Sequence, residues 1–159
     1  MSEFIQGSYF GIISGTITTI GLIIGLSAGT SSKIAIIVGI LTIAISDTLS
    51  DAFGMYMSRK VADTSDNSEA PLITAAGVVA AKFLISISFL IPMLMNTNII
   101  KGRNMSVIYA FIIIIAASSY LTHLRKEPLA QNVIKYIVIT VIVIVLTHYS
   151  GEAIANNIK

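Results

Sequence analysis

The sequence predicts an all-α, polytopic integral membrane protein with five transmembrane helices, and three observations lead to that fold class. Charged residues make up 11% and hydrophobic residues 55% of the 159 residues, whereas a soluble domain carries about 25% charged residues. The mean hydropathy is +0.87. The apolar residues fall into five long runs joined by short polar links. Because no link is long enough to fold alone, we expect a single transmembrane domain over residues 1–159.

The five runs have the lengths of helices that cross a bilayer. They cover approximately residues 9–28, 34–57, 70–95, 105–122 and 133–150. A bilayer core takes about 20 helical residues, whereas a strand of a membrane barrel takes about 9–11. Helices are favoured even where Ile and Val are frequent, because lipid offers the backbone no other hydrogen-bond partner.

Polar links and breakers separate the runs in order. The links lie at residues 29–33, 58–69, 96–104 and 123–132. Pro71 suits the first turn of the third helix, where no backbone N–H is needed. Pro128 marks a break between the fourth and fifth runs. Each predicted helix therefore has a chemical reason to begin or end where its apolar run does.

Five spans place the two termini on opposite sides of the membrane, and the basic residues predict which side is which. The side of the N-terminus holds Arg59, Lys60, Arg125, Lys126 and Lys135, and the other side holds Lys33, Lys101, Arg103 and Lys159. Because positive links stay in the cytoplasm, this small excess predicts a cytoplasmic N-terminus. In a prokaryote the membrane would be the cell membrane.

Several classes of protein are disfavoured by composition. The chain has no Cys, so disulfides, thiolate nucleophiles and zinc knuckles are excluded. The basic residues are scattered, which is not the pattern of a nucleic-acid-binding surface. No paired nucleophile and base and no phosphate-binding loop are recognisable. We therefore expect neither an enzyme, nor a tightly bound cofactor, nor a nucleic-acid partner.

Two carboxylates fall inside the second predicted helix. Asp47 and Asp51 are four residues apart, so they lie on one face, a turn apart. A charge at the middle of a bilayer costs about 2.5–3.5 kcal/mol on insertion scales, and such a residue is by default a functional candidate. One interpretation is a binding site for a cation or a proton. The other is a structural staple, in which both acids pair with an internal Lys.

Lys82 is the candidate partner, because it lies about midway along the third predicted helix. Its stem is too short to bring the ammonium from that depth to the headgroups. It could neutralise one Asp, or it could act as an internal cation that a metal ion or proton displaces. Hydroxyls of Ser14 and Thr18 on the first helix could add oxygen ligands, or could bond back to their own helix.

The predicted metal-ligating residues are Asp47, Asp51, Ser50 and Met55, with Lys82, Ser14 and Thr18 as pathway or counter-charge residues. Ser50 lies next to the face of the two carboxylates, and Met55 continues that face. Oxygen ligands suit hard divalent cations such as Mn²⁺, and they tolerate Fe²⁺. A thioether would add a softer contact, although Met more often fills space.

Glycines recur at every fourth position in the first predicted helix. Gly11 and Gly15 form one pair, and Gly21, Gly25 and Gly29 form a second series. This spacing lets helix backbones approach closely. It fits a dimer seam or a pore-lining helix, and it equally fits packing within one chain.

The order of these features resembles the vacuolar iron transporter family. The resemblance rests on residues 14–15 and 21–29 in the first helix, 49–58 in the second, Pro71 and 89–94 in the third, and 127–129 and 148–151 in the last segment. It covers nearly the whole chain. It implies the five-helix fold of that family, here as a short member lacking the cytoplasmic metal-binding region between helices two and three.

The resemblance further implies a homodimer that moves Fe²⁺ or Mn²⁺ out of the cytoplasm in exchange for protons, through a pore lined by helices one and two. In this chain Ser14 stands where the family has Asp, Asp51 where it has Met, and Met55 where it has Glu. Asp47 stands where the family has a small residue, and Thr42 where it has an earlier Glu. The acidic chemistry has therefore moved to Asp47 and Asp51.

Together these features predict a membrane transporter of divalent metal cations. It would be proton-coupled, with a carboxylate-lined pathway at a homodimer interface formed through the glycine-rich first helix. The metal ion would be the transported substrate, with Fe²⁺ or Mn²⁺ as first candidates, and the partners would be lipid, metal ions and protons. The alternative is a non-transporting membrane scaffold or partner subunit in which Asp47, Asp51 and Lys82 form a buried polar cluster.

Overall fold

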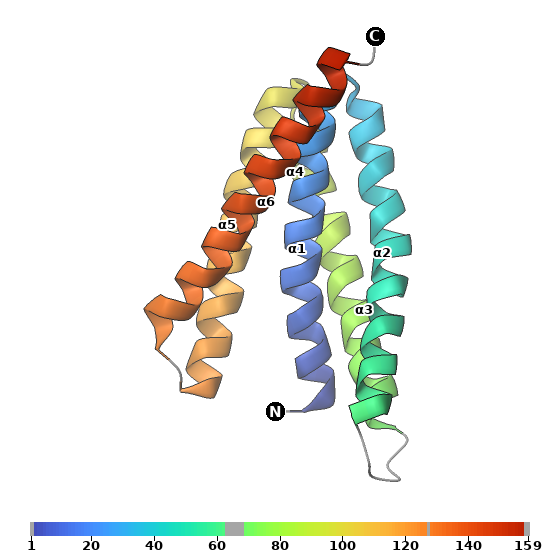
Figure 1. Cartoon of the computed structure of the whole chain (residues 1–159), viewed down its shortest axis with the longest axis vertical. Helices are drawn as coiled ribbons and strands as arrows, with labels where there is room; N and C mark the ends of the chain where they lie inside the picture. Colours follow the sequence, from blue (N-terminus) through green and yellow to red (C-terminus); the bar gives the residue numbers. More distant parts are fainter. Residues whose placement is uncertain (1, 63–68, 127, 158–159) are drawn as a thin grey trace.

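The computed structural model describes residues 2–62, 69–126 and 128–157. These residues form six helices and no strand, which confirms the all-α fold class. The helices are α1 (Glu3–Gly29), α2 (Lys33–Ala62), α3 (Ala70–Ser88), α4 (Leu90–Met95), α5 (Ile99–Arg125) and α6 (Leu129–Asn157). Figure 1 shows them as a bundle in which the start of α1 and the end of α6 lie at opposite ends.

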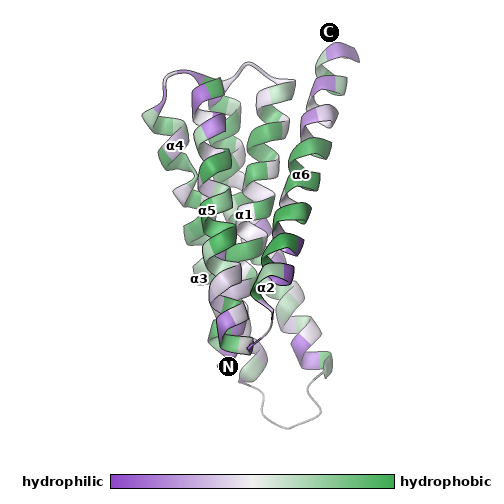
Figure 2. Cartoon of the chain, turned by 90° about the vertical axis from the view of Figure 1, so that its left-hand side faces the viewer, coloured by the Kyte–Doolittle hydropathy of each residue, from purple (hydrophilic) through white to green (hydrophobic). Residues whose placement is uncertain are grey.

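Five spans are long and apolar enough to cross a membrane in the described part of the chain, and α3 and α4 together make one of them. The chain is therefore a multi-pass membrane protein. Apolar residues fill the middle of the helices, and hydrophilic residues gather toward their ends (Figure 2). We call the end where α1 begins the N-terminal face and the end where α6 finishes the C-terminal face.

The helices are longer than the sequence predicted. The fourth run was expected over 105–122, whereas α5 spans Ile99–Arg125, and α6 continues to Asn157. Apolar runs mark only the part of a helix that lies in hydrocarbon. The backbone continues its own hydrogen bonding into the polar interface, so the prediction was too short at most boundaries.

The third span is broken, which corrects the prediction of one helix over 70–95. Phe89 forms a turn between α3 and α4, and its N–H donates to the carbonyl oxygen of Ser86 over 3.3 Å. Pro92 explains the break, because it has no N–H to give to the carbonyl of Ser88 and its ring clashes with that group. Both halves still follow the same span.

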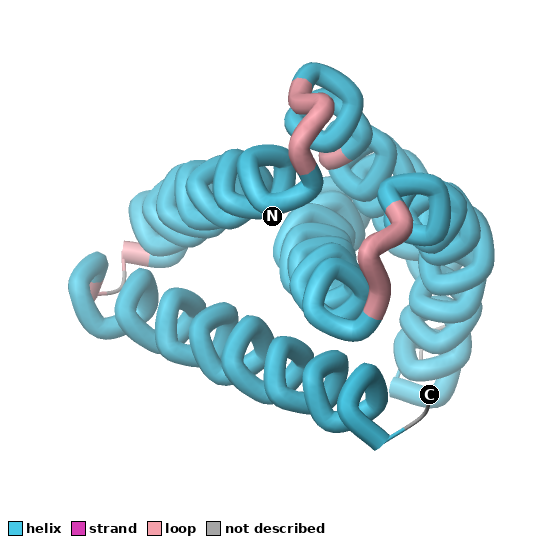
Figure 3. The backbone as a smooth tube through the Cα atoms, turned by 90° about the horizontal axis from the view of Figure 1, so that it is seen from above, coloured by secondary structure: helices cyan, strands magenta, loops and turns pink. Residues whose placement is uncertain are grey.

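Helix α1 lies inside the bundle and contacts α2, α3, α5 and α6. Figure 3, which looks along the bundle, shows the other helices around it. A Cβ added at Gly7 would lie 1.9 Å from the carbonyl oxygen of Thr74 in α3. On another side of α1, a Cβ added at Gly151 of α6 would lie 2.3 Å from the carbonyl oxygen of Gly25. Both contacts bring backbones together.

The glycines of the first helix pack within the chain, which is one of the two uses that their spacing predicted, and the homodimer stays a prediction. Gly11 and Gly15 pack against α3, and Gly21, Gly25 and Gly29 pack against Thr147 or Gly151 of α6. The four-residue spacing is used within one chain on two sides of α1.

The apolar core lies toward the C-terminal face. Its buried members come from the second half of α1, the first half of α2, the α3–α4 break and α5, namely Ile20, Ile23, Ile24, Ile36, Ile40, Phe89, Met93 and Ala110. Phe89 also stacks edge-on against Tyr109, with ring centroids 5.1 Å apart. We call these eight residues the apolar plug, and they leave the polar residues to the other half of the bundle.

Candidate cation site

Lys82 is completely buried in the middle of α3, under the backbone of α1. A Cβ added at Gly11 would lie 2.9 Å from the backbone nitrogen of Lys82, and one added at Gly15 would lie 3.1 Å from its Cγ. The two glycines therefore leave the room that the Lys82 stem occupies. These glycines of α1 therefore let α1 and α3 pack closely, and they leave room for the charged side chain of Lys82 between the two helices.

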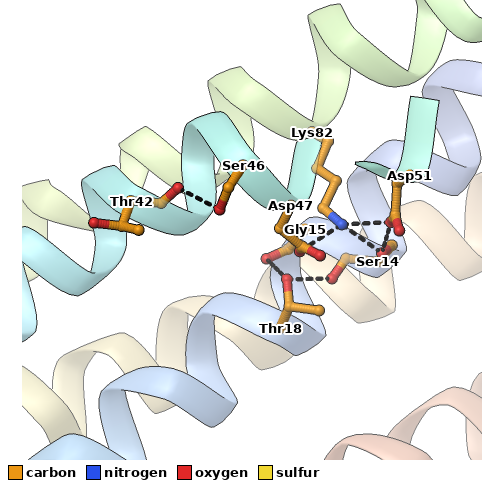
Figure 4. A network of polar contacts seen from close by, with 8 residues as sticks. All are labelled: Ser14, Gly15, Thr18, Thr42, Ser46, Asp47, Asp51 and Lys82. Carbon is orange, nitrogen blue, oxygen red and sulfur yellow. Dashed lines mark hydrogen bonds and ion pairs between the residues drawn. The ribbon is translucent and has the colours of Figure 1, made fainter. Parts of the chain in front are cut away.

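Both predicted carboxylates reach this ammonium. The Nζ atom of Lys82 lies 2.6 Å from Oδ2 of Asp47, and it also forms an ion pair with Oδ2 of Asp51. Figure 4 shows Nζ between the two acids, which come from successive turns of α2. The side chains of Asp47 and Asp51 are 31% and 27% exposed, whereas that of Lys82 is not exposed at all. The prediction that Lys82 partners the acids is confirmed, with both of them paired rather than one left free.

Ser14 completes the cluster from α1. Its hydroxyl donates to Oδ2 of Asp51 over 2.7 Å and accepts from Nζ of Lys82 over 3.1 Å. Thr18 does not join it, because its hydroxyl donates to the carbonyl oxygen of Ser14 over 3.0 Å. A hydroxyl that bonds back to the preceding turn is the commoner arrangement in helices. We call Ser14, Asp47, Asp51 and Lys82 the ionic cluster.

The other two predicted ligands lie elsewhere. Ser50 is on the exposed side of α2, three residues from Asp47, whereas the Lys82 ammonium that both acids reach is completely buried. Met55 lies one turn beyond Asp51 and packs against the small core of Ala52, Ala75 and Val78. That Ser50 joins the ligands stays a prediction, and Met55 is a wall residue beside the cluster.

The cluster has a charge imbalance that decides its chemistry. With all three side chains charged, two carboxylates face one ammonium, so one negative charge is uncompensated. Two carboxylates of one sign repel each other, and the ammonium between them offsets that repulsion. The arrangement can hold one more positive charge, or it can exchange the ammonium for another cation.

The described residues contain no group of three or more His, Cys, Asp or Glu side chains that could hold a metal ion. One chain therefore offers two carboxylates, with hydroxyl oxygen from Ser14 beside them. A divalent ion usually takes six or more oxygen ligands. A complete shell would need water, backbone oxygens or a second copy of the chain.

Some polar residues near the cluster were missed from the sequence. Arg59 stands three turns from Asp47 on α2, in the row of every fourth residue that includes Asp51 and Met55, and this spacing could have identified it. Hydroxyls of Thr48 and Ser86 are buried and have no hydrogen-bond partner in the described parts of the chain. A buried hydroxyl without a partner costs about 1–3 kcal/mol of the free energy of unfolding, so these two hydroxyls lower the stability of the fold. The sequence gives no pattern from which the burial of a single Ser or Thr hydroxyl could have been predicted.

No family model, no curated protein and no solved structure matches this chain. The resemblance to the vacuolar iron transporter family stays a prediction made from the sequence. The chemistry of the ionic cluster therefore has to be argued from its own geometry.

Proposed function

We propose that the chain is a proton-coupled membrane transporter of divalent cations, with Asp47 and Asp51 as the cation-binding groups. The observation that supports it best is the fully buried Lys82, which is paired with both acids inside a membrane span. Charges at that depth are costly and mark ion pathways. The family resemblance adds Fe²⁺ and Mn²⁺ as the first substrates to test.

Lys82 provides the coupling in this proposal. Its ammonium occupies the place between the two carboxylates that an incoming cation needs. A divalent cation at that place repels the ammonium, which favours either movement of the side chain or loss of its proton. Acid has the opposite effect, because protons compete for the same two carboxylates. Cation binding and proton binding are thereby mutually exclusive.

A homodimer would bring four carboxylates together, and we propose that it forms through α2. The exposed side of α2 carries a small residue at every fourth position: Thr42, Ser46, Ser50, Gly54 and Ser58. A Cβ added at Gly54 would meet nothing within 4 Å, so this side is uncovered in the monomer. Small residues in such a row favour close helix packing in membranes. A second copy there would also cover the half-exposed Asp47 and Asp51.

The topology that belongs to this proposal has a cytoplasmic N-terminus, and in a prokaryote it places the protein in the cell membrane. The support is the positive-inside pattern of the links, which include Arg59 and Lys60 at the end of α2. The test of this topology is to tag both termini and to treat sealed cells with a protease. We expect the tag on the cytoplasmic N-terminus to be protected.

The test is Mn²⁺ uptake into proteoliposomes that contain the purified chain and carry a pH gradient. We expect uptake by the wild type and loss of uptake in Asp51→Asn, since the amide removes the charge and keeps the shape. Glu69→Gln is the matched control, because it makes the same change outside the spans. Unchanged uptake in Asp51→Asn would remove Asp51 from the cation site.

The second candidate function is a non-transporting scaffold or partner subunit. It is favoured by the closed pairing of Lys82 with both acids, which satisfies the charges without any ion. It predicts no cation flux under any gradient and a loss of folding in Lys82→Met. A pH-dependent Mn²⁺ flux with the purified chain would exclude it.

A further inference from the structure

A cavity opens toward the N-terminal face between α1, α2, α3, α5 and α6. Its volume is about 500 Å³, many times the volume of about 30 Å³ that a water molecule takes in the liquid. The polar residues in its wall are Gln6, Tyr9, Ser14, Arg59, Thr74 and Tyr136. Phe10, Ile13, Met55 and Leu121 complete the wall, and the six polar side chains give water the hydrogen-bond partners that it needs inside a protein.

The cavity ends at the ionic cluster. Ser14 lines its wall, and the same hydroxyl donates to Asp51 and accepts from Lys82. On α2, Met55 and Arg59 line the cavity one and two turns from Asp51. The cavity therefore meets the ionic cluster at Ser14, and along α2 its wall comes within one turn of Asp51.

The mouth of this cavity carries an ion pair. Arg59 lies 3.6 Å from Oε2 of Glu3, and both side chains are more than a third exposed. Arg59 also borders a second, smaller cavity that Glu3, Ala62 and Pro71 line. The mouth thus carries exposed charged side chains that are paired with each other.

The apolar plug closes the other direction. Seven of its eight members, among them Ile20 and Phe89, are 0% exposed, and Ile24 is 5% exposed. These side chains come from four helices and fill the space between the cluster and the C-terminal face. They offer no polar atom to a water molecule or an ion.

We propose that, in this structure, the ionic cluster is open to water from the N-terminal face alone and is sealed from the C-terminal face by the apolar plug. This inference rests on the proposed function. In a transporter, a site that is open to one side only is in the state that loads or releases the cation on that side. Protons and cations then reach Asp51 past Ser14. Transport to the other side requires the plug to separate.

The chain has no Cys, so single cysteines can be probed with a charged, membrane-impermeant thiol reagent in sealed, oriented vesicles. Ser2→Cys and Asn156→Cys mark the N-terminal and C-terminal faces. We expect Gln6→Cys and Ser14→Cys to react only when the reagent is on the side that labels Ser2→Cys. Ile24→Cys, in the plug, should react from neither side.

Three results would overturn the proposal: reaction of Ser14→Cys from the C-terminal face, reaction of Ile24→Cys from either face, or no reaction of Gln6→Cys and Ser14→Cys from either face. The last result means a cavity filled by lipid, which a lipophilic maleimide would then label. Each variant is scored only after gel filtration shows the wild-type elution, and Gln6→Cys tests the cavity if Ser14→Cys does not fold. Sided labelling without Mn²⁺ uptake would refute the proposed function and leave the water route standing.

Discussion

On the side where α1 faces the third span, the two halves of the bundle are built by opposite means, whereas α1 meets α6 through glycines toward the C-terminal face. Near the N-terminal face, α1 meets α3 through Gly7, Gly11 and Gly15, and the space so gained holds a buried Lys and a polar cavity. Near the C-terminal face, the same helices meet through large side chains such as Ile23 and Phe89.

This difference separates binding from sealing. Backbone-to-backbone packing leaves room for polar groups, because glycine removes side-chain volume from the seam. Packing by Ile, Phe and Met leaves no such room and excludes water. The molecule therefore has a half that can hold a charge and a half that blocks its passage, along one set of helices.

The largest effect should come from removing the partners of the buried ammonium. In Asp47→Asn with Asp51→Asn, Lys82 stays fully buried without a carboxylate, and removing the partners of a buried charge costs about 3–5 kcal/mol. Thermal unfolding in detergent measures it. Adding Lys82→Met to the pair should restore most of the lost stability. A triple variant as unstable as the double would show that charge is not the cause.

A smaller loss should follow from adding a methyl group to the glycine seam. In Gly7→Ala the new Cβ would lie 1.9 Å from the carbonyl oxygen of Thr74, so α1 and α3 must separate. Overpacking of this kind costs about 1–3 kcal/mol of the free energy of unfolding. Gly54→Ala is the control, because its Cβ would meet nothing within 4 Å. Equal melting temperatures for the two variants would contradict the seam.

The plug is tested by a polar substitution that should change function more than stability. Ile40→Ser places a hydroxyl among fully buried apolar side chains, and we expect a faster decay of a pH gradient across proteoliposomes. Ile45→Ser makes the same change at a position 58% exposed on the same helix. If both variants leak at the wild-type rate, the plug does not seal the pathway.

The smallest effect should be at the mouth. Arg59→Gln removes an exposed ion pair with Glu3, and such pairs contribute about 0–1 kcal/mol. Melting should hardly change. The rate at which a cationic thiol reagent labels Ser14→Cys should rise, because a positive charge leaves the entrance. An unchanged rate would place Arg59 outside the route.

Much of the fold was readable from the sequence, because hydropathy and breakers report on spans directly. The five spans and the partnership of Lys82 with the acids followed from length, spacing and depth. The break at Phe89 was missed, although Pro92 signalled it.

The use of the glycines could not be predicted. Glycines spaced four residues apart indicate that a second helix backbone packs closely against the first. They do not indicate whether that second helix belongs to the same chain. The position of α3 and α6 on two sides of α1 decided it. Arg59, Thr74 and Tyr136 were missed for a related reason, since they come from three helices and form one wall only after packing.

The central claim is that Asp47 and Asp51 bind a cation, and its most direct test is heat protection of the detergent-solubilised chain by Mn²⁺, measured at neutral pH and at successively lower pH. Binding to the native state raises stability, by about 2.7 kcal/mol at a hundred times the dissociation constant. We predict protection that fades on acidification and is absent from Asp47→Asn and Asp51→Asn. Fe²⁺, Mg²⁺ and Na⁺ in parallel rank the substrates. Equal protection of the wild type and both variants, or protection by no cation at any pH, would contradict the claim.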